Sequence, residues 1–158
     1  MRLYTSYFYQ IRFFTPNMVP VSTAVWDPKW YHNFAGQDSV FLDKRSVVNG
    51  LRAPALAPGP QLEGTCVGKD GAALGCTHDP STCTFLRGYA DQLSRLDCDD
   101  YVHRLENLGN RIKQIAGFNG EPVIVLIVYE APDNPCSERV ALQQWFSTHG
   151  HEISEWRR

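Results

Sequence analysis

Val123-Ile124-Val125-Leu126-Ile127-Val128-Tyr129 is the stretch that decides the fold class of this chain. It is a continuous run of β-branched and aliphatic residues, without the polar alternation of a strand that has one face in water. Such runs are typical of central strands in parallel sheets, whose two faces are both covered. The run is far shorter than the roughly 20 residues of a membrane-spanning helix. It therefore predicts a buried strand in an α/β protein.

Helical patterns lie on both sides of this strand. Residues of one apolar stripe recur at helical spacing before it, namely Tyr101, Leu105, Leu108, Ile112 and Ile115. Asp97, Asp99 and Asp100 suit the start of that helix as caps and as charges near the positive end of its dipole. Phe85 to Leu96 predicts an earlier helix, and a final helix is expected from about Cys136 to Ser147.

Further strands are expected at both ends of the chain. Leu3 to Phe14 opens as a strand and runs into a loop before Pro16. Met18 to Trp26 contains a second strand, and Ile153 to Trp156 forms a last edge strand. Pro20 should lie at the start of its strand or on an exposed side, because it has no N–H to donate. This order predicts a small three-layer α/β domain with a mostly parallel sheet and helices on both faces.

Length and composition fit one globular domain over residues 1–158. The chain is 43% hydrophobic and 20% charged, with a net charge of −2. That charge gives no electrostatic signature of non-specific binding to nucleic acids or membranes. No secretory signal is apparent at residues 1–9, and the five cysteines are an odd number for a disulfide framework. We therefore expect reduced thiols and a cytoplasmic location.

An irregular, cysteine-containing insertion is expected at about residues 49–83, where prolines and glycines argue against regular structure. Its potential zinc ligands are Cys66, Cys76, Cys83 and His78. Four such ligands can bind a tetrahedral zinc ion, which would supply folding energy that the insertion lacks. Cys98 is a substitute ligand. The alternative is a set of free thiols, because no Cys-x-x-Cys pair is present.

The strongest candidate site follows the central strand, from Glu130 to Arg139. In open α/β sheets, ligands bind beyond the carboxyl ends of the strands. Cys136 would lie at a helix N-terminus, which lowers a thiol pKa, and Arg139 is suited to a phosphate or carboxylate. Alternatively, Asp133 or Asn134 merely caps the helix, Cys136 packs, and Glu138 and Arg139 are solvated.

A second group of polar and aromatic residues follows the second strand. Asp27, Lys29, Trp30 and Tyr31 combine charges with rings that can stack on a nucleobase. Arg45, Asn49 and Arg52 add polar groups able to reach the same cleft. Core packing is the alternative role for the aromatic side chains. No Gly-rich phosphate loop, Gly-x-Ser-x-Gly turn or His-Glu-x-x-His helix is present.

Several of these segments resemble the DUF488 family: Leu3 to Phe8, Val21 to Ala24, Pro28 to Trp30, Val125 to Glu130 and Asn134 to Arg139. The Cys-His-Arg group of that family reads Cys136-Ser137-Glu138-Arg139 here, so no role of its histidine is carried over. The resemblance implies a Rossmann-like α/β fold and a site that uses Glu130, Cys136 and Arg139. With it, Tyr4, Ser6, Ser137 and Glu138 become candidate ligand-binding residues.

Three functions are consistent with these residues. The first is an enzyme that cleaves or exchanges the N-glycosidic bond of a nucleotide or modified base, with Glu130 or Asp27 as the reacting carboxylate. The second is a non-catalytic module that sequesters a nucleotide-like ligand or a partner protein. The third, thiol redox chemistry at Cys136, has less support because no resolving cysteine is close in sequence.

Overall fold

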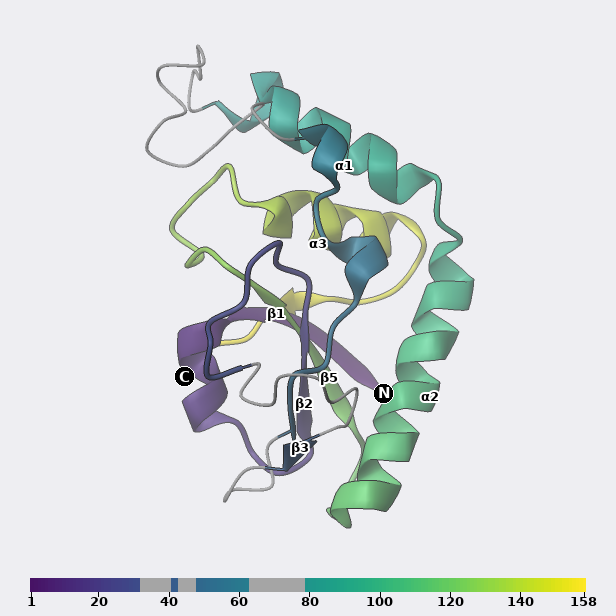
Figure 1. Ribbon diagram of the computed structural model, residues 1–158. Coiled ribbons are helices and arrows are strands. Elements are labelled where there is room, and N and C mark those ends of the chain that lie inside the picture. The colour runs from purple at the N-terminus through teal and green to yellow at the C-terminus, as the bar shows by residue number, and fades with distance from the viewer. Residues whose placement is uncertain (32–40, 43–47, 63–78) are drawn as a thin grey trace.

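The fold is built on a four-stranded sheet, seen in a computed structural model that describes residues 1–31, 41–42, 48–62 and 79–158. The strands are β1 (Arg2–Tyr7), β2 (Met18–Ser22), β5 (Val123–Val128) and β6 (Ser154–Glu155). Their order is β2-β5-β1-β6, and every pairing is parallel (Figure 1). The prediction of a parallel α/β sheet is confirmed.

The run that identified the central strand forms β5, with all of its residues buried. Ile124 pairs with Leu3 of β1 on one side and with Val19 of β2 on the other. This position explains the composition of β5, because its side chains meet protein on both faces of the sheet.

All three α-helices of the described residues pack on one face of this sheet. They are α1 (Thr84–Ser94), α2 (Cys98–Ala116) and α3 (Glu138–Thr148) (Figure 1). Buried residues of all three helices join Leu3, Val21 and Leu126 in one hydrophobic cluster. As expected, Asp97 caps α2, accepting a hydrogen bond from the Asp100 backbone N–H at 3.0 Å. The helix ends at Gly117, whose left-handed φ of 69° suits glycine.

The opposite face is covered by a short 3-10 helix, η1 (Phe8–Phe13), together with Ala24 and Tyr31. The strand at the start of this segment ends at Tyr7, and most of the loop expected before Pro16 is 3-10 helix. Phe8, Ile11 and Phe14 are all buried, and this three-residue spacing matches a 3-10 turn rather than the alternation of a strand. Helical structure thus lies on both faces, but the second face has 3-10 rather than α-helix.

Pro20 lies within β2, which is an edge strand of the sheet. Two residues further on, the Ser22 N–H and C=O bond to Leu51 and Ala53, away from β5. In a parallel strand alternate residues point the same way, so the nitrogen of Pro20 also faces away from β5. Hence no ladder bond to β5 is lost, although Pro20 is buried in the middle of β2 rather than at its start or on an exposed side.

Part of the proline-rich insertion is ordered by contacts with α1. It contains η2 (Pro54–Leu56) and η3 (Pro60–Leu62), and both leucines are buried. Gln92 of α1 donates to Ala57 O at 2.7 Å and accepts from Gly59 N at 2.8 Å. The remaining short elements are β3 (Phe41–Leu42), antiparallel β4 (Val48–Asn49) and η5 (Pro80–Thr82).

Candidate functional site

The candidate site lies where three neighbouring strands end. Because the strands are parallel, Tyr7 at the end of β1 pairs with Val128 at the end of β5, and Ser22 of β2 pairs with Ile127. The segments that follow them therefore begin side by side, at the edge where α/β proteins place their ligands.

The segment after β5 is shaped by side chains that bond to its own backbone. Asn134 Oδ1 accepts from the Cys136 N–H at 3.0 Å, and Ser137 caps α3 by accepting from the Arg139 N–H at 3.3 Å. Thus Ser137, not Asp133 or Asn134, is the helix cap. The partly exposed Cys136 precedes this cap rather than lying inside the helix.

Two carboxyl groups meet between this segment and α3. Glu138, at the first position of α3, is only 4% exposed and hydrogen-bonds Glu130. Burial, followed by the charge of Glu130, raises the pKa of Glu138 to about 8, although Arg139 acts in the opposite direction. Glu138 is therefore mostly protonated at neutral pH and acts as a hydrogen-bond donor to the Glu130 carboxylate.

Arg139 is buried and points into the protein. Its Nε donates to Glu155 Oε2 at 2.7 Å, its Nη2 to the Glu130 carbonyl at 2.7 Å, and its Nη1 to Ser137 Oγ at 3.4 Å. The guanidinium therefore holds the backbone of Glu130 in place. In this arrangement it is a positioning residue, and the expected phosphate-binding role has no geometric support.

Arg139 is also part of a buried polar network that the sequence did not predict, formed with Glu155, Thr5 and Gln143. Thr5 donates to Glu155 Oε2 at 2.6 Å and accepts from Gln143 Nε2 at 2.6 Å. Burial raises the pKa of Glu155, while Thr5 and Arg139 lower it. The network ties α3 to β1 and β6, which fixes the start of α3 relative to the sheet. Thr5, a polar residue at a buried position of β1, was the available signal.

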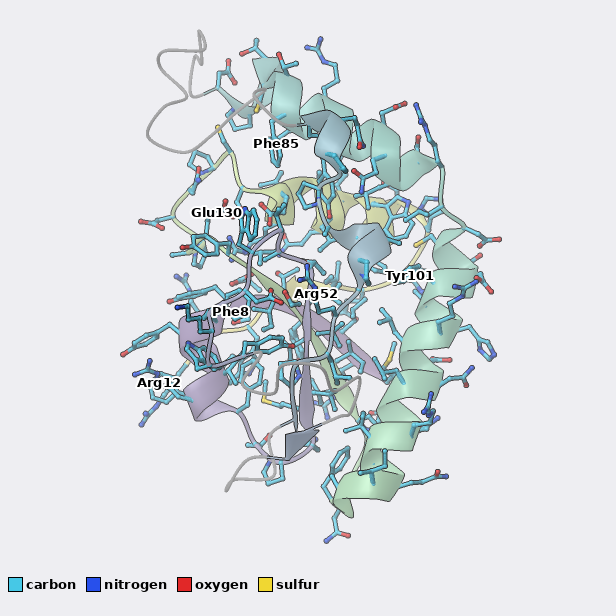
Figure 2. The ribbon with its side chains drawn as sticks, viewed as in Figure 1. Phe8, Arg12, Arg52, Phe85, Tyr101 and Glu130 are labelled. Atoms are coloured by element: carbon cyan, nitrogen blue, oxygen red, sulfur yellow. The ribbon has the colours of Figure 1, made fainter. Side chains whose placement is uncertain are left out.

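The second predicted group lies on the opposite face of the same edge. Asp27 has a fully buried side chain, accepts a hydrogen bond from Ser22 Oγ and pairs with Arg52 at 3.3 Å. Arg52 also donates to Ala24 O at 2.8 Å (Figure 2). Asp27 and Arg52 are thus brought together as predicted, but their contacts organise the loop after β2.

The exposed and buried aromatic side chains are not the ones that the sequence predicted. Tyr31 is fully buried, and its hydroxyl donates to Leu51 O at 2.6 Å, so it belongs to the core. Trp30 remains 43% exposed. Trp26 and Tyr129, at 79% and 63% exposed, are the large rings at this edge that the sequence reading missed. Their positions just after two strands were the signal available for finding them.

The other ligand-binding candidates are dispersed. Ser6 is buried and donates to Trp156 O at 2.8 Å, Tyr4 is half-buried, and Lys29 is exposed. Only the backbone of Asn49 is described, in β4, and Arg45 lies outside the described residues.

Three of the four potential zinc ligands, Cys66, Cys76 and His78, also lie outside the described residues. Cys83 is buried and caps α1, accepting from the Leu86 N–H at 3.5 Å. Cys98 is 2% exposed, and burial raises its pKa to about 11. Within the described ranges, no three metal-binding side chains come together.

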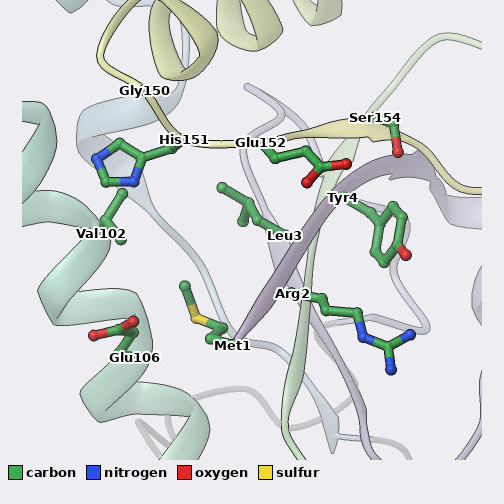
Figure 3. A pocket seen from close by; sticks show the side chains of 10 residues that line it. All are labelled: Met1, Arg2, Leu3, Tyr4, Val102, Glu106, Gly150, His151, Glu152 and Ser154. Atoms are coloured by element: carbon green, nitrogen blue, oxygen red, sulfur yellow. The ribbon is translucent and has the colours of Figure 1, made fainter.

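A cavity of about 280 Å³ lies away from these residues, around the amino-terminal half of β1 (Figure 3). Its lining includes Arg2, Tyr4, Glu106, His151 and Glu152. It forms just before β6 begins, because β6 pairs only with Tyr4 and Thr5 and leaves the amino-terminal end of β1 uncovered on that side. Apart from Tyr4, it contains none of the predicted site residues.

Comparison with protein-family models, curated proteins and solved structures finds no match to this chain. No helix in the described part of the chain combines the length and hydrophobicity needed to cross a bilayer.

Proposed function

We propose that the protein is an enzyme that cleaves or exchanges the N-glycosidic bond of a nucleotide or nucleobase, with Glu130 as the reacting carboxylate. The observation that carries this proposal is the Glu130–Glu138 pair at the end of the central strand. A pair of carboxyl groups is the usual equipment for glycosyl-transfer chemistry.

The two carboxyl groups differ in exposure, and we assign them different roles. Glu130 is partly exposed and suited to stabilise or attack the oxocarbenium-like carbon as the bond to the base breaks. Glu138 is buried and hydrogen-bonded to it, which places the two groups closer than the roughly 5 Å between the carboxyls of retaining glycosidases. Glu138 therefore acts through Glu130, by orienting it.

The surrounding side chains suit a flat, polar ligand. Tyr129 is adjacent to Glu130, and Trp26 follows the neighbouring strand, so exposed rings lie along the same edge as the carboxylate. Stacking on such rings binds nucleobases with little regard to sequence. Membership of the DUF488 family stays part of this proposal, supported by the Glu130, Cys136 and Arg139 pattern at the start of α3.

The proposal predicts base release that depends on Glu130. Incubating the protein with nucleosides, nucleotides and oligonucleotides bearing modified bases should release a free base, measured by liquid chromatography. Glu130→Gln should lower the rate at least about 100-fold, because the amide can neither attack nor balance the developing positive charge. Glu152→Gln, which changes an exposed carboxyl elsewhere, should retain the rate. No release from any substrate would refute the proposal.

A binding module is the second candidate, and the internal bonding of the site favours it. Asp27 and Arg139 both point inward to protein partners, which leaves few polar groups for chemistry. Calorimetry with the same compounds distinguishes the two functions: stoichiometric binding with the ligand recovered intact supports sequestration. Thiol redox chemistry remains the third, and a thiol pKa at Cys136 equal to that of free cysteine would remove it.

Structural zinc remains a prediction from the sequence alone. Purified, untagged protein should contain about one equivalent of zinc by elemental analysis if Cys66, Cys76, Cys83 and His78 bind it. Cys83→Ala should then lower the zinc content. Substoichiometric metal would instead indicate free thiols.

A further inference from the structure

The 3-10 helix η1 carries aromatic rings and the guanidinium group of Arg12 on its outer side. Arg12 lies 4.0 Å from the centroid of the Tyr9 ring. Tyr9 in turn stacks with Tyr7, their ring centroids 6.5 Å apart and their planes inclined by 17°. Both Tyr9 and Arg12 are exposed, and Figure 2 shows Arg12 extending outward from the molecule.

Arg158 adds a second contact between a guanidinium group and an aromatic ring of η1. Arg158 lies 4.7 Å from the centroid of Phe13, and its backbone N–H donates to Gln10 Oε1 at 3.1 Å. The buried Gln10 also donates to the Tyr7 hydroxyl at 3.0 Å. The Gln10 side chain therefore connects Tyr7 to the backbone of Arg158. We call Tyr7, Tyr9, Arg12, Phe13 and Arg158 the cation–aromatic face.

The charge around this face differs from that of the whole chain, which is −2. Residues 3–26 contain Arg12 but no Asp or Glu. Arg157, which is exposed, adds a further positive charge next to Arg158. The local charge is therefore complementary to a phosphate backbone.

The face also adjoins the proposed catalytic edge. Tyr7 pairs with Val128, so the start of η1 lies beside the Tyr129-Glu130 segment. The exposed Tyr129 places a further ring next to Glu130. A ligand lying along η1 would thus have its nearest end at the carboxylate pair.

We propose that the cation–aromatic face binds single-stranded nucleic acid and presents one of its bases to Glu130. Guanidinium groups match the backbone phosphates, and the exposed tyrosine rings match unstacked bases. A duplex keeps its bases stacked inside and offers such rings nothing to contact. The binding surface stands on its own observations, whereas delivery to Glu130 rests on the proposed function.

The test is fluorescence anisotropy with a labelled 12-nucleotide oligo(dT) and a duplex of equal length. We expect saturable binding of the single strand that weakens as salt is raised, and weaker binding of the duplex. Tyr9→Ala should lower affinity between about five- and 150-fold, the range of one stacked base. Arg12→Glu should lower affinity and flatten the salt dependence. Arg111→Glu, a charge reversal at an exposed position of α2, should keep near-parental affinity.

Thermal melts establish that each variant is folded, and Tyr9→Leu, which keeps apolar area without a ring, replaces Tyr9→Ala if that variant melts early. Absence of oligonucleotide binding would overturn the inference, even if free nucleosides are still cleaved. Equal losses from Arg111→Glu and Arg12→Glu would also overturn it, and so would self-association of the protein that Arg12→Glu abolishes. Glu130→Gln should retain oligonucleotide binding while losing base release, which separates this inference from the proposed function.

Discussion

Glu138 is a carboxyl group whose protonation state depends on folding. In the unfolded chain it has the ordinary pKa of a glutamate, near 4.5, whereas in the folded protein burial and Glu130 raise the pKa to about 8. Below pH 4.5 Glu138 is protonated in both the folded and the unfolded protein, and well above pH 8 it is ionised in both. Between these limits the folded state binds more protons, so the contribution of Glu138 to stability falls as pH rises.

Glu138→Gln should remove this pH dependence. The glutamine amide replaces the protonated carboxyl as a donor to Glu130 but cannot ionise. We therefore expect the stability of the variant, relative to the parent, to increase by up to about 3 kcal/mol between pH 5 and pH 7, because a proton contributes about 1.4 kcal/mol per pH unit. Urea denaturation at a series of pH values measures the difference.

Glu106→Gln is the matched control, since Glu106 is an exposed side chain on α2. Its stability difference from the parent should stay nearly constant over the same pH range. A Glu138→Gln difference that is equally flat would show that Glu138 is already ionised at neutral pH, and Glu130 would lose its proposed hydrogen-bond donor.

Individual site residues were the least predictable part of the molecule. Glu130 could be located because it follows a strand that is recognisable from its composition. Its partner Glu138 was expected to be ligand-binding or solvated, and its burial depends on how α3 packs. Similarly, nothing local distinguishes the buried Tyr31 from the exposed Trp26. Exposure is set by tertiary packing, which residue type alone does not determine.

The first turn of helix α2 is stabilised by its own acidic side chains. Asp97 accepts from the Asp100 N–H, and the acidic side chains of Asp99 and Asp100 face the positive end of the helix dipole. Asp97→Ala should therefore cost about 1 kcal/mol in the free energy of unfolding, measured by urea denaturation.

Asp91→Ala provides the comparison for that loss. Asp91 forms an exposed pair with Arg95 in the last turns of α1, at 2.8 Å. Exposed pairs of this kind contribute about 0–1 kcal/mol, so its loss should be smaller than that of Asp97. Equal losses in the two variants would show that capping is not the interaction that matters.

The elements with one dominant periodicity were predicted correctly. The apolar stripe and acidic first turn located α2, and the unbroken β-branched run located β5. The 3-10 helix η1 was not predicted, because Tyr7, Tyr9 and Ile11 alternate as in a strand, whereas Phe8, Ile11 and Phe14 have the three-residue spacing of a 3-10 turn. A short segment satisfies both patterns, and only the sheet face that it covers decides between them.

Across the whole molecule, the order of strands in the sheet differs from their order in the chain. β5 lies between β1 and β2, although more than a hundred residues separate it from either in sequence. A fragment of residues 1–117 therefore contains β1 and β2 but lacks β5, the strand that lies between them and pairs with both. It should show no cooperative thermal transition by circular dichroism, whereas the full chain should. A cooperative transition in the fragment would show that the helices alone sustain a fold.

The late arrival of β5 also has a consequence during synthesis. The ribosome adds roughly 5–20 residues per second, so β1 and β2 wait on the order of ten seconds for the strand that joins them. Throughout that interval their apolar side chains and unpaired backbone groups are accessible to other nascent chains and to chaperones. Yield of active protein in the cell should therefore depend on growth temperature and chaperone supply more than the stability of the finished fold would suggest.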